Sequence, residues 1–232
     1  MIKASIKNFF HSSGIELKWH DKSFDKFIAL QKKYRDFTMV PSEIFKANLD
    51  LCVHFKHLNG DYVECGVWRG GMSAAIAEIL EKDKMIYLFD SFEGLPQAKE
   101  IEGIRAMEWQ RDVNSPAYYD NCKTEESFAH KAMQLAGHKN YSTHKGWFNQ
   151  TLPEFKNHSI AILRLDGDWY DSIMVCMDEL FPQVIDGGIV LIDDYYVWDG
   201  CSKAIHDYLS KVKSASRIYQ WDNQVAYIIK QS

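Results

Sequence analysis

The chain has 232 residues, of which 46% are hydrophobic and 25% charged, and its formal net charge is −5. This mixture is typical of a globular domain with a sizeable core and argues against disorder. The acidic balance argues against a nucleic-acid-binding surface, which needs clustered basic residues. Because no apolar run approaches the ~20 residues that span a bilayer, we expect no membrane partner.

The five cysteines and the first twenty residues bear on the compartment. The number of cysteines is odd, no pair is closely spaced and no zinc pattern occurs, which favours reduced thiols. Residues 1–20 are interrupted by charge and lack the apolar stretch of a signal peptide. The sequence therefore predicts a cytoplasmic protein.

Residues 1–60 are predicted to form a helical cap ahead of a core in residues 61–232, the whole making a single domain. Apolar side chains at helical spacing in residues 24–34 indicate one helix, and a Pro-Ser-Glu start at residues 41–43 indicates another. Such helices cap the sheet, cover a ligand or join subunits, and the last alternative would give a homodimer.

From residue 61 the pattern alternates between strands and helices, which is typical of a doubly wound, mostly parallel α/β sheet. The predicted strands are residues 62–67, 85–90, 141–144, 160–166, 188–193, 217–221 and 225–229. The predicted helices are residues 72–80, 125–136, 173–181 and 201–212. A short Asp-Asn turn between the last two strands predicts a terminal antiparallel hairpin. Residues 91–124 show little periodicity, and a loop of that length is usually functional or mobile.

Two of the predicted strands end in carboxylates. Residues 162–172 pass from an apolar strand into an Asp-Gly-Asp turn that begins at Asp166, and residues 187–195 pass into Asp193 and Asp194. Ligands of open α/β sheets bind at the carboxyl ends of the strands, so neighbouring strands would bring Asp166, Asp193 and Asp194 together. Crowded carboxylates repel one another unless a cation lies between them, and oxygen ligands suit hard divalent ions. We therefore expect a Mg²⁺ site; the alternative is three solvated turn or cap residues.

The turn after the first strand contains Glu64, Gly66 and a Gly-Gly pair at residues 70–71. A dinucleotide site would need G-x-G-x-x-G, but Trp68 stands where the second glycine should be. Glu64 would repel a phosphate and suits a ligand that carries an ammonium and a sulfonium. Asp90 ends the second strand, where an acid accepts hydrogen bonds from ribose hydroxyls. Together these residues describe a nucleoside pocket without a pyrophosphate, which S-adenosylmethionine fits; the alternative is a plain strand-to-helix turn.

Several stretches resemble the macrocin-type sugar O-methyltransferases (the TylF/MycF family). They are VECGVWRGG at 63–71, DSFEGLP at 90–96, GWF at 146–148 with TLP at 151–153, RLDGDWYDS at 164–172, and GGIVLIDDY at 187–195. The resemblance covers about residues 62–208. Residues 97–123 and 1–60 depart from the family pattern, and we expect these parts to shape the pocket for the methyl acceptor.

The resemblance implies a class I, Rossmann-like fold with a seven-stranded sheet, and an enzyme that uses S-adenosylmethionine and Mg²⁺. It implies methylation of a hydroxyl on a sugar or a glycosylated small molecule. The implied metal ligands are Asp166, Asp193 and Asp194, with Asp166 also catalytic. The implied cofactor-binding residues are Glu64, Gly66, Val67, Trp68, Asp90, Ser91, Trp147, Phe148 and Asp166.

Several points stay open at this level. Trp147 and Phe148 either stack on adenine or pack in the core. His144 and His206 are candidate bases for an acceptor hydroxyl held by the metal, although a lone histidine is more often structural. Alternative functions are methylation of a catechol or phenol, and a non-catalytic nucleotide- or sugar-binding module. Trp68 speaks against a dinucleotide oxidoreductase.

Overall fold

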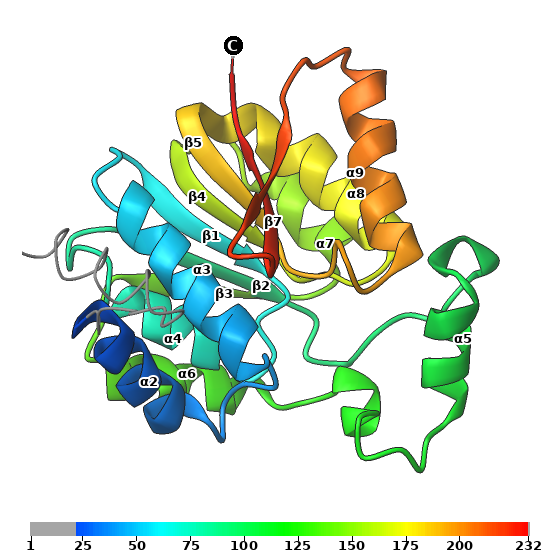
Figure 1. Ribbon diagram of the computed structural model, residues 1–232, viewed down its shortest axis with the longest axis horizontal. Helices are drawn as coiled ribbons and strands as arrows, with labels where there is room; N and C mark the ends of the chain where they lie inside the picture. The colour runs from blue at the N-terminus through cyan, green and yellow to red at the C-terminus, as the bar shows by residue number, and fades with distance from the viewer. Residues whose placement is uncertain (1–21, 232) are drawn as a thin grey trace, which may run out of the picture.

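The structure is a computed structural model that describes residues 22–231 (Figure 1). The expectations for residues 1–20, including the absence of a signal peptide, lie outside the described residues. Within the described range, no helix is both long and apolar enough to cross a membrane.

The centre of the molecule is a seven-stranded sheet with the order β3-β2-β1-β4-β5-β7-β6. The strands are β1 Asp61–Cys65, β2 Ile86–Asp90, β3 Tyr141–Lys145, β4 Ile160–Leu165, β5 Val184–Ile192, β6 Ile218–Trp221 and β7 Val225–Ile229. The first five are parallel, and β7 pairs antiparallel with both β5 and β6. The predicted doubly wound sheet with a terminal hairpin is confirmed. Strand order reverses between β1 and β4, and this is where such sheets bind ligands.

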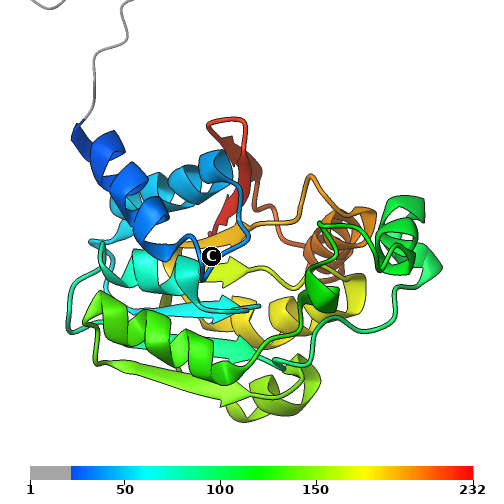
Figure 2. The same ribbon diagram turned by 90° about the horizontal axis from the view of Figure 1, so that it is seen from below.

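Helices cover both faces of the sheet (Figures 1 and 2). One face carries α2 Lys22–Tyr34, α3 Ser42–Phe55, α4 Gly71–Ala77 and α6 Glu126–Ala136; the other carries α7 Phe148–Thr151, α8 Tyr170–Leu180 and α9 Asp199–Lys211. The helix ends follow local chemistry: α3 starts directly after Pro41, α6 ends at Gly137 with φ +64°, and Pro182 follows α8.

Alternate residues of the strands supply two hydrophobic cores, one for each layer of helices. Tyr62 and Leu88 belong to the core under α2, α3, α4 and α6, whereas Val63 and Phe89 belong to the core under α8 and α9. Phe45 of α3 is fully buried in the first core. Helix α3 therefore packs on the sheet and α2 packs on α3 and α4, so the N-terminal helices do cap the sheet, one of the three roles that the sequence left open.

The segment expected to be one long loop contains a helix that the sequence pattern did not predict. Residues 97–123, here called the insert, include a 3-10 turn at Glu100–Glu102 and the helix α5 at Ile104–Arg111. In Figure 1 the insert extends away from the sheet. Helix α5 has only eight residues and buries little beyond Ala106, so its apolar periodicity is too weak to predict it.

Replacing Phe45 with alanine should destabilise the protein by about 3–5 kcal/mol, because it opens a cavity in the core that α3 shares with the sheet. Chemical denaturation followed by circular dichroism measures the change. The control is Ile104→Ala at a side chain that is 71% exposed, where the change should stay within about 0.5 kcal/mol. Equal stabilities for the two variants would contradict a shared core.

Candidate active site

A cavity of about 730 Å³ lies at the carboxyl ends of β1, β2, β4 and β5, which is a volume typical of small-molecule sites. Every residue that the sequence marked as a cofactor or metal ligand lines it: Glu64, Gly66, Val67, Trp68, Asp90, Ser91, Trp147, Phe148, Asp166, Asp193 and Asp194. The connection between α2 and α3 also contributes Phe37, Thr38, Met39, Val40 and Pro41. The N-terminal segment therefore forms part of the cavity wall as well as a cap on the sheet.

Gly66 lets the turn after β1 pass directly over the end of β4. Its φ is +89°, and a Cβ placed there would lie 1.7 Å from the carbonyl oxygen of Asp166. The backbone N–H of Asp166 donates to the carbonyl oxygen of Cys65 at 2.8 Å, so the two strand ends are joined at this point. A side chain at position 66 would force them apart, which is why the turn requires glycine.

Asp90 occupies the backbone donors of this first turn. Its Oδ2 accepts hydrogen bonds from the N–H groups of Val67 and Trp68, each at 2.7 Å, and its Oδ1 accepts one from the N–H of Phe92 at 2.6 Å. Burial raises the pKa of Asp90, and the three donors act in the opposite direction. In dinucleotide-binding folds the donors of this turn bind a pyrophosphate. Here a carboxylate takes them, which agrees with a pocket for a nucleoside without phosphate.

Arg164 lies at the centre of the site with none of its side chain exposed. Its Nη1 contacts Glu64 Oε1 at 2.7 Å and Asp166 Oδ2 at 2.8 Å, and its Nη2 pairs with Asp193 Oδ1 at 2.7 Å. Its Nε donates to Asn48 Oδ1 at 3.2 Å. One buried cation thus joins carboxylates from β1 and from the ends of β4 and β5 to an amide on α3.

The charge of Glu64 is compensated from within the protein. The side chain is 1% exposed, and its Oε2 accepts hydrogen bonds from the hydroxyls of Tyr62 and Ser73. Burial raises the pKa of Glu64, and Arg164 opposes that rise. The sequence suggested that this acid faces a cationic ligand. Its oxygens instead contact Arg164 and two hydroxyls, so Glu64 lines the cavity floor without an unpaired charge.

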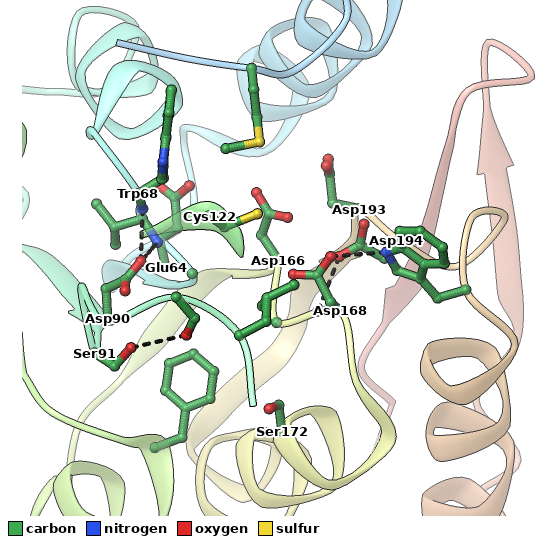
Figure 3. Close-up of a pocket in the computed structure, with 18 of the residues that line it drawn as sticks. Glu64, Trp68, Asp90, Ser91, Cys122, Asp166, Asp168, Ser172, Asp193 and Asp194 are labelled. Carbon is green, nitrogen blue, oxygen red and sulfur yellow. Dashed lines mark hydrogen bonds between the residues drawn. The ribbon is translucent and has the colours of Figure 1, made fainter. Parts of the chain in front are cut away.

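Asp166, Asp168 and Asp194, here called the acidic cluster, bring carboxylate oxygens within 4.8 Å of one another. Figure 3 shows Asp166 between Asp90 and the pair formed by Asp168 and Asp194. Burial raises the pKa of Asp166 to about 7 although Arg164 lowers it. Burial and mutual repulsion raise the pKa values of Asp168 and Asp194 well above their usual range. The donors are all oxygen, and Arg164 pairs with Asp166 alone of the three, so the arrangement fits a hard divalent ion.

Two of the three expected metal ligands, Asp166 and Asp194, therefore lie together. The third member of the cluster is Asp168, and the expected ligand Asp193 is oriented differently. Its Oδ1 pairs with Arg164 and accepts a hydrogen bond from Asn48 Nδ2 at 3.2 Å, and in Figure 3 its carboxylate points away from Asp194. Asp193 still lines the cavity.

Neither histidine considered as a base reaches the cavity. The His144 ring stacks on Phe89 with ring centroids 4.4 Å apart, and burial lowers its pKa. His206 Nε2 lies 2.9 Å from the Tyr195 hydroxyl on the outer side of α9. Among the residues that the structure describes, the cavity lining contains no histidine or lysine, so carboxylates are the basic groups at hand.

Comparison with known proteins identifies the family of this chain. Residues 34–230 match the macrocin O-methyltransferase (TylF) family. The chain belongs to this family. Demethyldecarbamoylnovobiocin O-methyltransferase from Streptomyces niveus is 32% identical over 174 residues, which are 72% of this chain and 65% of that protein. The chain thus spans just under two thirds of that relative's length.

Two further comparisons agree with the assignment to the TylF family. One relative is the 8-demethyl-8-(2,3-dimethoxy-α-L-rhamnosyl)-tetracenomycin-C 4'-O-methyltransferase from Streptomyces olivaceus. It is 31% identical over 193 residues, which are 75% of this chain and 69% of that protein. The solved structure of the O-methyltransferase NovP superposes with a TM-score of 0.70 at 26% identity, over 84% of this chain and 83% of NovP. The fold is therefore that of a class I methyltransferase, as the sequence predicted.

The sequence patterns did not identify some site residues of this TylF-family chain. Asn48 belongs to a helix that precedes the first strand, and nothing local indicates that it reaches Arg164. Asp168 stands in the acidic turn already noted, and its φ of +55° is what places its carboxylate beside that of Asp194. Trp109 and Trp198 also line the cavity, and Trp198 Nε1 donates to Asp168 Oδ1 at 2.9 Å.

Replacing Arg164 with methionine should destabilise the protein by about 3–5 kcal/mol, because it leaves buried carboxylates without their counter-charge. The pKa values of Glu64 and Asp166, which Arg164 lowers, then rise further above the unfolded values near 4, so the native state binds protons that the unfolded state releases. The loss should therefore be larger at pH 8 than at pH 5. Urea denaturation at both pH values measures it, with exposed Arg111→Met as the control. A loss independent of pH would contradict this role for Arg164.

Proposed function

We propose that the protein is an S-adenosylmethionine- and Mg²⁺-dependent O-methyltransferase, which acts on a hydroxyl of a sugar or a glycosylated small molecule. The observation that carries the proposal is the acidic cluster at the inner end of a nucleoside-sized cavity, at the reversal point of a TylF-family sheet. The names of the two curated relatives, one of which refers to a rhamnosyl group, support a sugar-bearing acceptor.

The cofactor is assigned to the half of the cavity beside β1 and β2. Asp90 ends β2 there with its carboxylate fixed by three backbone donors, and carboxylate oxygens keep further lone pairs for the ribose hydroxyls. Trp147 and Phe148 line the same cavity and supply aromatic surface for the adenine. Ser91, 8% exposed, follows Asp90 directly. These residues fit a nucleoside with a sulfonium, and Asp90 already occupies the N–H groups of Val67 and Trp68 in the first turn.

The metal is assigned to the acidic cluster. Asp166 and Asp194 are ligands in this proposal, and the third carboxylate is either Asp168, which the geometry brings within reach, or Asp193, which the family resemblance implies. When bound, the ion polarises an acceptor hydroxyl and lowers its pKa.

The residues of the chain supply orientation and a proton acceptor. Methyl transfer from a sulfonium is an in-line displacement, and the acceptor oxygen must lie about 3–3.5 Å from the methyl carbon. Asp166 lies between the side of the cavity given to the cofactor and the rest of the cluster. Arg164 contacts its Oδ2, which leaves Oδ1 to take the hydroxyl proton. In this proposal Asp166 is therefore the catalytic residue.

A chelator such as EDTA should abolish methyl transfer and excess Mg²⁺ should restore it, because without the cation nothing lowers the pKa of the acceptor hydroxyl. Transfer of labelled methyl groups measures this, with dTDP-L-rhamnose, methyl α-L-rhamnopyranoside and 3,4-dihydroxybenzoate as acceptors. The first two represent sugars and the third a catechol. Full activity in excess EDTA would contradict the proposed role of the metal. Transfer to the catechol alone would contradict the proposal that the acceptor is a sugar.

A Mg²⁺-binding measurement identifies the third ligand. If Asp168 binds the ion, Asp168→Asn should weaken Mg²⁺ binding by about tenfold or more, as loss of one charged ligand contact commonly does, while Asp193→Asn should alter mainly stability through Arg164. If Asp193 is the ligand, Asp193→Asn should weaken Mg²⁺ binding by about tenfold or more and Asp168→Asn should leave it unchanged. Calorimetric titration with Mg²⁺ in the presence of S-adenosylhomocysteine gives both constants.

Asp90→Ala should weaken S-adenosylmethionine binding by about tenfold or more, since it removes both the ribose acceptor and the group that holds the first turn. Isothermal titration calorimetry measures the dissociation constant. The matched control is Asp186→Ala, an exposed aspartate in β5 away from the cavity, which should bind the cofactor normally. Unchanged affinity in Asp90→Ala would remove Asp90 from the cofactor site.

A further inference from the structure

The insert brings an indole to the acidic cluster. The Trp109 ring on α5 lies 5.9 Å from the Trp198 ring and 6.2 Å from the Trp169 ring, measured between centroids. Trp109 and Trp198 line the cavity, and Trp198 donates its indole N–H to Asp168. The aromatic wall therefore begins directly beside the carboxylates.

Glu102 joins the insert to the two helices that follow the acidic turns. Its side chain is buried, with 2% of the residue exposed, and its Oε2 accepts a hydrogen bond from the N–H of Tyr170 at 2.9 Å. Tyr170 is the first residue of α8 and stands two positions after Asp168. Gly200, in the first turn of α9, also packs against this carboxylate, because a Cβ there would lie 1.8 Å from Oε2.

A buried carboxylate between two helix N-termini is electrostatically favourable, since the unsatisfied N–H groups there carry partial positive charge. Burial raises the pKa of Glu102, and the Tyr170 N–H opposes that rise. The side chain of Gln110 on α5 bonds within the loop, to Pro96 O, Ala98 N and Asn121 Oδ1. Glu102 is thus a buried polar contact that fixes the insert to the core of the protein.

We propose that Glu102 is a positioning residue, which holds the insert so that Trp109 and Trp198 form the wall that binds the sugar ring of the acceptor. The inference rests on the proposed function and deepens it. Indole rings offer flat apolar faces with a polar N–H at the edge, which suits a sugar ring with C–H groups on one face and hydroxyls around it. The aromatic residues assigned to the cofactor lie at the start of α7, whereas the wall comes from α5 and the segment just before α9.

Hydrogen–deuterium exchange tests the positioning role without any need for catalysis. In Glu102→Ala the amides of residues 98–112 and of Tyr170 should exchange about tenfold faster or more, because a hydrogen bond to a charged group is lost. The matched control is Glu100→Ala, an exposed glutamate on the same 3-10 turn, which should exchange as the wild type does. Unchanged exchange in Glu102→Ala would overturn the inference.

Kinetics separate the acceptor from the cofactor. With dTDP-L-rhamnose or methyl α-L-rhamnopyranoside, Glu102→Ala should raise the acceptor KM about tenfold or more, while the dissociation constant for S-adenosylmethionine stays within about twofold. Glu102→Gln, whose amide oxygen still accepts from Tyr170, should recover most of the acceptor KM. A purely structural role would lower both affinities together and would overturn the inference.

Two further variants distinguish the proposed role of Glu102 from misfolding of the Glu102→Ala variant. Gly200→Ala displaces the Glu102 carboxylate from the other side and should reproduce the Glu102→Ala pattern. Trp109→Leu leaves Glu102 in place and should raise the acceptor KM without faster exchange at Tyr170. A normal acceptor KM in Trp109→Leu would contradict the proposal that the two indole rings bind the acceptor. If the wild-type protein methylates none of the sugar acceptors, the proposed function fails, and the exchange measurement still decides the role of Glu102.

Discussion

The buried charge of Arg164 is the constraint on which the site depends. Burying a guanidinium away from solvent costs several kcal/mol of folding free energy unless carboxylates and hydrogen-bond acceptors surround it. The sheet meets this requirement because Glu64 of β1 is the register partner of Arg164 in β4, while Asp193 follows the neighbouring strand β5. Asn48 adds an acceptor from α3. Strand order and the docking of an N-terminal helix are thereby coupled to a single side chain.

This arrangement separates the acidic residues into two groups with different tasks. Glu64 and Asp193 face Arg164, which compensates their charge inside the protein. Neither Asp168 nor Asp194 forms an ion pair with Arg164. Burial, and after it mutual repulsion, raises their pKa values, and a divalent ion would relieve that repulsion. Asp166 belongs to both groups, since one oxygen contacts Arg164 and the carboxylate also lies in the acidic cluster. This position suits a residue that is proposed both to bind the metal ion and to take up a proton.

The cavity divides along the same line. The side beside β1 and β2 is built from the glycine turn and from Asp90, whose oxygens occupy the backbone donors that other nucleotide-binding folds give to phosphate. The far side is built from the insert and the starts of α8 and α9, where indole rings meet the carboxylates. The first side includes the stretches at residues 63–71 and 90–96, whereas the second side includes the acidic turns and the insert.

The sequence by itself determined the strand pattern, the terminal hairpin, the family and part of the cavity lining, because buried strands, glycine turns and acidic strand ends are local patterns. It did not determine which acids point at one another. Asp168 and Asp193 look alike in the chain, yet the positive φ of Asp168 turns it into the acidic cluster and Arg164 draws Asp193 aside. Asn48, Glu102 and Trp109 act across long sequence separations, so their roles follow only from packing. Tertiary structure decided these points because the pairing of a buried charge depends on which side chains meet in space.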